Sequence, residues 1–238
     1  MSESIVLNNS IVGKLIVIDG TDGSGKATQS KLLITRLNDL GYKTVYFDFP
    51  RHGQPSAALV DEYLNGEFGK LEGIIGAKIA SGFYAFDRFS AAPLIREVLV
   101  NGGTAVCDRY VSANMGHQAG KIRDLTERNE YLAWLERLEF EKHGIPRPDL
   151  NILLNASTKI NQELVGKKDQ RIYLEGNKTH DLHESDSRHL DNAAEAFLYC
   201  AQKYNWSVIK CAPNGVMLSI EKIHQLVWKE VTSKFKID

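Results

Sequence analysis

The chain has 238 residues, of which 43% are hydrophobic and 25% charged, as in an ordinary globular protein. The 29 Lys and Arg nearly balance the 30 Asp and Glu, giving a formal net charge of -1. A partner such as a nucleic acid polymer or a membrane surface would favour a basic excess, which is absent. We expect one α/β domain over residues 1–238, with residues 1–12 as an N-terminal extension.

The cysteines and the first residues favour a cytoplasmic protein. Cys107, Cys200 and Cys211 are widely spaced and form no CxxC pair or Cys/His cluster, which is typical of free thiols in a reducing compartment. The opening sequence MSESIVLNNSIVGK lacks the features of a signal peptide. No segment has the apolar length that a membrane span needs.

Short apolar runs alternate with amphipathic stretches along the chain. The runs predict buried strands over 15–18, 44–47, 104–107, 150–154 and 206–209. The amphipathic stretches predict helices over 26–40, 125–143 and 220–235, and the first two stop at a glycine. Alternating strands and helices indicate a mostly parallel five-stranded sheet with helices on both faces.

The segment 166–190 interrupts this alternation. It is rich in charged residues and has no sustained apolar period. Such a segment is either a solvated surface insertion or a lid over a site, since long loops in compact domains are often lids.

The first strand leads directly into the sequence GTDGSGK, and a helical pattern follows at once. This matches the phosphate-binding pattern G-x-x-x-x-G-K in its required context. The glycines let backbone N–H groups surround phosphate oxygens, and Lys26 would reach the β- and γ-phosphates of ATP. The expected ATP-binding residues are Gly20, Thr21, Asp22, Gly23, Ser24, Gly25, Lys26, Ala27 and Thr28.

Ala27 departs from this pattern, because the residue after the lysine usually carries a hydroxyl that binds Mg²⁺. Thr28 is one residue further on and points about 100° away on a helix. Either Thr28 substitutes, or phosphate oxygens, waters and nearby carboxylates hold the ion. We favour the second hypothesis because Mg²⁺ retains several waters in most protein sites.

Three arginines suggest a second anion site. Arg51 ends the sequence FPR after the second strand, Arg88 ends FYAFDR, and Arg109 follows Asp108 in CDRY. Each alone is more often a surface ion pair, but together with a phosphate loop they favour a second phosphorylated substrate. An Asn-Lys-x-Asp motif, expected of a GTPase, does not occur.

From about Gly13 to the C-terminal helix, the sequence resembles the thymidylate kinase family. The resemblance is carried in order by IDGTDGSGKATQ, FPR, FYAFDR before PLIRE, DRYVSANMGHQ and PRPDL. It implies a P-loop kinase fold and a homodimer that converts dTMP and ATP to dTDP and ADP with Mg²⁺ in nucleotide biosynthesis. Under this resemblance, the segment 166–190 is expected to be the lid.

The resemblance also implies roles for individual residues. Asp22 would accept the 3′-hydroxyl of dTMP and help organise the metal, with Asp108 beside the metal or its waters. Arg51 and Arg109 would bind the acceptor phosphate. The base would stack on Tyr84 and hydrogen-bond to two further residues, Arg88 and Asn114.

The resemblance implies roles for three further residues. His117 occupies the place where the family often has a tyrosine or phenylalanine that disfavours a ribose, and Gln118 would orient it. Many kinases of this group supply a catalytic arginine either from the phosphate loop or from the lid, and the resemblance implies the lid here because no basic residue lies between Thr21 and Ser24. Of Lys167, Lys168 and Arg171 we choose Arg171, because a guanidinium can bridge two phosphates. The expected catalytic residues are therefore Lys26, Asp22, Arg109 and Arg171.

Two alternatives stay open. Another kinase of the same fold would accept dUMP, UMP or a deoxynucleoside, since fold does not decide the substrate. A nucleotide-binding protein with impaired catalysis is favoured only by Ala27, and the acceptor-phosphate arginines argue against it.

Overall fold

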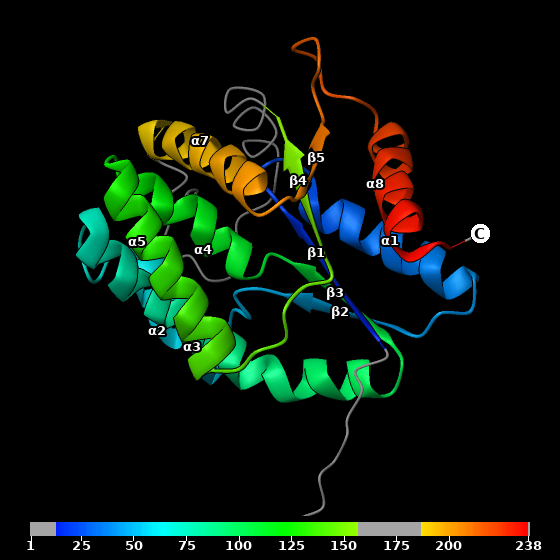
Figure 1. Cartoon of the computed structure of the whole chain (residues 1–238), viewed down its shortest axis with the longest axis horizontal. Coiled ribbons are helices and arrows are strands. Elements are labelled where there is room, and N and C mark those ends of the chain that lie inside the picture. The colour runs from blue at the N-terminus through cyan, green and yellow to red at the C-terminus, as the bar shows by residue number, and fades with distance from the viewer. Residues whose placement is uncertain (1–12, 157–186, 238) are drawn as a thin grey trace, which may run out of the picture.

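A computed structural model describes residues 13–156 and 187–237 and shows an α/β architecture (Figure 1). The strands are β1 (Lys14–Asp19), β2 (Thr44–Asp48), β3 (Thr104–Asp108), β4 (Leu150–Asn155) and β5 (Ser207–Lys210). The α-helices are α1 (Lys26–Asp39), α2 (Ala58–Asn65), α3 (Gly73–Val100), α4 (Val111–His117), α5 (Leu125–Glu136), α7 (Ser187–Lys203) and α8 (Ile220–Phe235). Short 3₁₀ or π segments are η1 (Pro55–Ala57), η2 (Ala119–Lys121) and η3 (Arg137–Lys142).

All strand pairs in the five-stranded sheet are parallel, in the order β2-β3-β1-β4-β5. Asp108 at the end of β3 is opposite Ile18 of β1 and opposite Asp48 of β2. The C-terminal ends of these three strands therefore meet at one edge, which is where open α/β sheets bind ligands.

Side chains of β1 alternate between two cores, as expected for a strand covered on both faces. Leu15 and Val17 belong to the core under α3, α4 and α5, whereas Ile16 and Ile18 belong to the core under α1 and α8. Figure 1 shows α1 and α8 on one side of the sheet and α3, α4, α5 and α7 on the other. The predicted α/β fold with a parallel five-stranded sheet and helices on both faces is confirmed.

The predicted elements agree closely with the observed ones, with one difference. The helix expected over 125–143 is α-helical only to Glu136 and continues as the π-helical segment η3. It ends before Gly144, which has a φ of +60°. The change to a wider turn places Glu139 in the interior, fully buried.

Some expectations fall partly or wholly outside the described residues. Of the lid segment 166–190, residues 187–190 form the first turn of α7, and the rest lies outside the described residues, together with the extension 1–12. Among the helices of residues 13–156 and 187–237, none is long and apolar enough to cross a membrane.

Candidate active site

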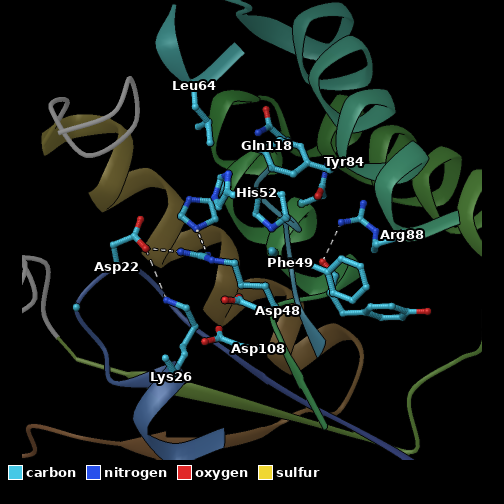
Figure 2. A pocket seen from close by; sticks show the side chains of 18 of the residues that line it. Asp22, Lys26, Asp48, Phe49, His52, Leu64, Tyr84, Arg88, Asp108 and Gln118 are labelled. Carbon is cyan, nitrogen blue, oxygen red and sulfur yellow. Dashed lines mark hydrogen bonds and ion pairs between the residues drawn. The ribbon is translucent and has the colours of Figure 1, made fainter. Parts of the chain in front are cut away.

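A cavity of about 310 Å³ lies at the C-terminal edge of the sheet (Figure 2). The phosphate loop, the segments after β2 and β3, and helices α3 and α4 form its wall. The expected site residues that line it are Asp22, Gly23, Gly25, Lys26, Ala27, Tyr84, Arg88, Asp108, Arg109, Asn114, His117 and Gln118. The described residues that were expected in the site but do not line this cavity are Gly20, Thr21, Ser24, Thr28 and Arg51.

The phosphate loop joins β1 to α1 in a conformation that requires glycine. Gly20 and Gly25 have φ of +149° and +95°, and a Cβ on Gly20 would overlap the carbonyl of Leu154. Gly25 is the N-cap of α1, so the positive end of that helix dipole faces the cavity. This is the anion-binding arrangement that the sequence motif predicts.

Lys26 lies under the loop with its ammonium group inside the site. Its Nζ donates to the Thr21 carbonyl at 3.0 Å and lies 3.7 Å from Oδ1 of Asp22. Burial lowers the pKa of Lys26, and the nearby charge of Arg109 lowers it further, against the opposing effect of Asp22. An anionic ligand would raise the pKa of this lysine again.

Arg109 occupies the centre of the site. Its Nη2 forms an ion pair with Asp22, and its Nη1 lies 3.0 Å from Nε2 of His117. Burial alone would lower the pKa of Arg109, but the carboxylates of Asp22, Asp19 and Asp108 outweigh it and raise the pKa above the ordinary value. The guanidinium therefore remains charged between the phosphate loop and α4.

Asp19 is a structural anchor that sequence reasoning did not assign to the site. This buried carboxylate accepts from the Gly20 N–H at 2.8 Å and from the Ser112 hydroxyl at 2.7 Å. Burial raises its pKa, and the nearby Arg109 opposes that effect. The only sequence signal was an acidic residue between a buried strand and the phosphate loop.

Arg51 is turned toward α3 instead of the cavity. Its Nε donates to Oδ1 of Asp87 at 2.9 Å, and its backbone N–H donates to Oδ2 of the same carboxylate at 2.8 Å. Ser56 connects the pair, because its hydroxyl donates to Asp87 and receives a bond from Arg51. The Arg51 side chain is thus held by Asp87 and Ser56 and does not line the cavity.

The far end of the cavity has the chemistry of a base pocket. Tyr84 lines it, and its ring meets the ring of Tyr63 edge-on at 6.4 Å. Asn114 and Gln118 line it as well and are 3% and 1% exposed. Among the described residues, Nδ2 of Asn114 and Oε1 of Gln118 have no hydrogen-bond partner. One donor and one acceptor are therefore buried at the cavity wall without a partner in the described part of the chain.

Two carboxylates lie together on the sheet edge. Asp48 and Asp108 are register partners at the ends of β2 and β3, and both line the cavity beside Lys26 (Figure 2). Burial and the charge of Asp108 raise the pKa of Asp48 to about 6. Such a pair suits Mg²⁺, which is commonly held by one or two carboxylates plus phosphates and waters. Among the described residues, no group of three or more His, Cys, Asp or Glu forms a metal cage.

Sequence reasoning also missed His52, Asp87 and Glu139. His52 lines the cavity with its Nδ1 2.5 Å from Oδ1 of Asp61, and it directly follows the FPR motif. Asp87 and Glu139 form ion pairs with Arg51 and Arg88. Asp87 stands within the FYAFDR motif, whereas no local pattern marks Glu139.

A loop for one set of phosphates faces a central arginine, with a base pocket beyond it. A phosphotransferase of the nucleoside monophosphate kinase class needs this combination of a phosphate loop, a cation at the transferring phosphate and an acceptor pocket. The family described as thymidylate kinase matches residues 18–214. A thymidylate kinase of Mycobacterium tuberculosis is 31% identical over 73% of this chain and 78% of its own length. The thymidylate kinase of Schizosaccharomyces pombe is 31% identical over 62% of this chain and 63% of its own length.

The chain belongs to the thymidylate kinase family. A solved thymidylate kinase structure from Candida albicans, 22% identical, covers 94% of this chain and 92% of its own with a TM-score of 0.70, which supports the fold. The expected family, the P-loop kinase fold and the activity of a thymidylate kinase are thereby confirmed.

Proposed function

We propose that this chain transfers the γ-phosphoryl group of ATP to dTMP, giving dTDP and ADP, in nucleotide biosynthesis. The observation that carries the choice of acceptor is the pair of buried groups in the base pocket, Nδ2 of Asn114 and Oε1 of Gln118. Thymine presents a carbonyl acceptor next to an N3–H donor, so its edge complements this pair. Because an amide offers a donor and an acceptor in either orientation, this pair fits a pyrimidine edge, and Arg88, which can only donate, favours the carbonyl of thymine over an amino group.

Tyr84 provides the apolar face of the same pocket. A flat aromatic ring gives a large contact area with little loss of conformational entropy, which suits a stacked pyrimidine. Arg88 donates to a base carbonyl from the other side. His117, whose Nε2 accepts from Arg109, takes in this proposal the place where the family often has a tyrosine or phenylalanine that disfavours a ribose.

The acceptor phosphate lies between the arginines in this proposal. Arg109 is already inside the cavity, and Arg51 joins it by turning part of its guanidinium away from Asp87. Asp22 accepts a hydrogen bond from the 3′-hydroxyl of the acceptor, while Lys26 stays in contact with the phosphoryl group as it is transferred. Charge on the transferring group is spread over its oxygens, so positioned cations lower the barrier without a covalent step.

Mg²⁺ is the proposed cofactor, and it supplies charge neutralisation at the β- and γ-phosphates when bound. Asp108, with Asp48 beside it, offers the better protein contact. The carboxylate of Asp22 is already paired with Arg109 and Lys26, so its share in holding the metal is smaller. Ala27 lines the cavity without a hydroxyl, and the side chain of Thr28 is exposed and outside it.

The catalytic arginine is proposed to be Arg171 of the lid, which lies outside the described residues. The observed loop supports a supply from elsewhere, since its cavity-facing residues between Gly20 and Gly25 are Asp22 and Gly23.

A cytoplasmic homodimer is proposed as the working form. The three cysteines are free thiols and buried, and burial raises the pKa of each. Helix α3 exposes an apolar stripe with near-helical spacing on its outer face, which suits a second copy of the same helix. Its residues are Ile75, Ile79, Phe86 and Phe89.

A coupled assay that detects ADP with a panel of monophosphates tests the acceptor. We expect turnover with dTMP, weaker turnover with dUMP because one methyl contributes only about 1–3 kcal/mol, and little with dCMP, because its amino group stands where Arg88, which can only donate, needs a carbonyl. Preference for UMP or for a deoxynucleoside would support the alternative that the chain is another kinase of the same fold. If no acceptor stimulates ADP formation, the result would support the alternative of a nucleotide-binding protein with impaired catalysis.

A further inference from the structure

Glu139 is a fully buried carboxylate behind the base pocket, outside the cavity wall. Its Oε1 accepts two hydrogen bonds from Arg88, from Nε at 3.0 Å and from Nη2 at 2.5 Å. Arg88 is itself only 1% exposed, yet it reaches the wall of the cavity (Figure 2). The two residues form a buried ion pair with one end at the proposed acceptor base.

A third contact fixes the plane of the guanidinium. Nη1 of Arg88 donates to the backbone carbonyl of Tyr110 at 3.2 Å. Tyr110 is anchored in turn, because its hydroxyl donates to the Pro146 carbonyl at 3.1 Å and its ring packs against Phe49. Each terminal nitrogen of an arginine has two hydrogens, so Nη1 and Nη2 each retain one beyond these contacts.

The energetics of this pair favour a role beyond stability. Among the described residues, Oε2 of Glu139 has no hydrogen-bond partner, so Arg88 provides the polar contacts that offset burial of this carboxylate. A buried ion pair contributes little net stability, and well-packed apolar residues often replace it without loss. What an apolar pair cannot provide is an arginine with a fixed orientation.

The backbone around Glu139 supports a fixed position. Glu139 lies in the π-helical segment η3, and such wide turns occur frequently at functional sites. Its carbonyl accepts from the Ile145 N–H at 3.1 Å, which ties the turn to the chain leading into β4. The carboxylate is therefore held by the fold on one side of Arg88, and Tyr110 holds the other side.

We propose that Glu139 is a positioning residue for acceptor recognition: it orients the Arg88 guanidinium so that its free hydrogens donate to a carbonyl of the pyrimidine. This inference rests on the proposed role of Arg88 at the base. Because a guanidinium only donates, the arrangement favours a base with a carbonyl over one with an amino group at that position.

The test compares Glu139→Gln, Glu139→Asp, Arg88→Met and the double variant Arg88→Met/Glu139→Gln. Initial rates are measured against dTMP, dCMP and ATP, and each variant is checked by thermal unfolding. Glu139→Gln should raise KM for dTMP about tenfold with kcat and KM for ATP within about twofold, because it loosens an acceptor contact. Glu139→Asp, which keeps the charge but retracts it, should give a smaller rise and keep most of the dTMP over dCMP preference.

The double variant separates positioning from a general structural effect. If Glu139 acts through Arg88, the double variant has the same KM for dTMP as Arg88→Met alone, although the effects of independent residues would multiply. It also removes both buried charges, so it remains measurable if Glu139→Gln unfolds. Multiplying effects, or equal losses for ATP and dTMP, would overturn the inference. An unchanged KM for dTMP in Arg88→Met would instead overturn the proposed role of Arg88 itself.

Discussion

Nη1 of Arg109 and Nε2 of His117 lie 3.0 Å apart, with the imidazole as the acceptor of the hydrogen bond. A neutral ring is required for this contact, because a protonated imidazole only donates. Burial, reinforced by the charge of Arg109, lowers the pKa of His117 well below 6.5. Asp22 opposes the shift, whereas His189 and Lys26 add to it.

This relationship predicts a dependence of stability on pH. Since folding lowers the pKa of His117, the unfolded chain takes up a proton first as the pH falls below about 6.5. The free energy of unfolding should then decrease, by at most about 1.4 kcal/mol per pH unit from this group. Urea unfolding at pH 7.5, 6.5 and 5.5 should show a smaller loss for His117→Gln than for the native sequence. Parallel pH curves for the two proteins would contradict the assignment.

Arg51 is expected to act on the acceptor and not on ATP. Arg51→Ala should raise KM for dTMP by about tenfold or more, since a hydrogen bond to a charged group contributes about 1.5–3 kcal/mol. Ser56→Ala removes only one support of the Asp87–Arg51 pair, so its effect should be about threefold or less. The matched control is Arg36→Ala, which removes an arginine stacked on Trp228 far from the cavity. A larger rise in KM for ATP than for dTMP would refute this role.

The parts of the site that sequence predicted are those with local signals. The phosphate loop is recognisable because strand, glycines and helix follow one another without interruption. Arg109, at the end of a buried strand, was predicted by the same reasoning, because parallel strands end at one edge.

The supports of these residues could not be predicted, because the contacts join distant parts of the chain. Arg88 and Glu139 are 51 positions apart, and Arg51 and Asp87 are 36 positions apart. A buried glutamate in an amphipathic stretch has the pattern of an exposed one until the π turn rotates it inward. Only the packing of η3 against α3 shows that Glu139 faces an arginine.

The phosphate loop without a hydroxyl predicts a specific response to magnesium. Ala27→Ser should leave the Mg²⁺ concentration for half-maximal velocity within about twofold, because carboxylates, phosphates and waters already satisfy the ion. Asp108→Asn should raise it about tenfold, the scale on which changes around a metal site act. Titrations of Mg²⁺ at saturating ATP and dTMP measure both. A large fall in the Mg²⁺ requirement of Ala27→Ser would show that the missing hydroxyl matters.

Arg171 is predicted to stabilise the transferring phosphoryl group. Arg171→Ala should lower kcat by about 10³-fold, as removal of an arginine finger does, with small changes in either KM. Lys167→Ala and Lys168→Ala serve as matched controls in the same segment and should have much weaker effects. A kcat of Arg171→Ala within about twofold of the native value would exclude this residue.

Close packing of α4 on α7 predicts a strict requirement for glycine next to His117. A Cβ on Gly116 would overlap the ring of Phe197, which is 1% exposed and also meets the His117 ring edge-on at 5.3 Å. Gly116→Ala should therefore reduce the free energy of unfolding by about 1–3 kcal/mol, the usual cost of overpacking. Urea unfolding measures this cost.

Phe197→Leu provides the compensating change, because a smaller side chain makes room for the new methyl group. The variant with both substitutions should lose less stability than the two single losses added together, as expected for residues in direct contact. Because the same ring supports His117, Gly116→Ala should also raise KM for dTMP while KM for ATP stays near its native value. Strict additivity of the two stability losses would show that the ring of Phe197 is not what excludes a side chain at position 116.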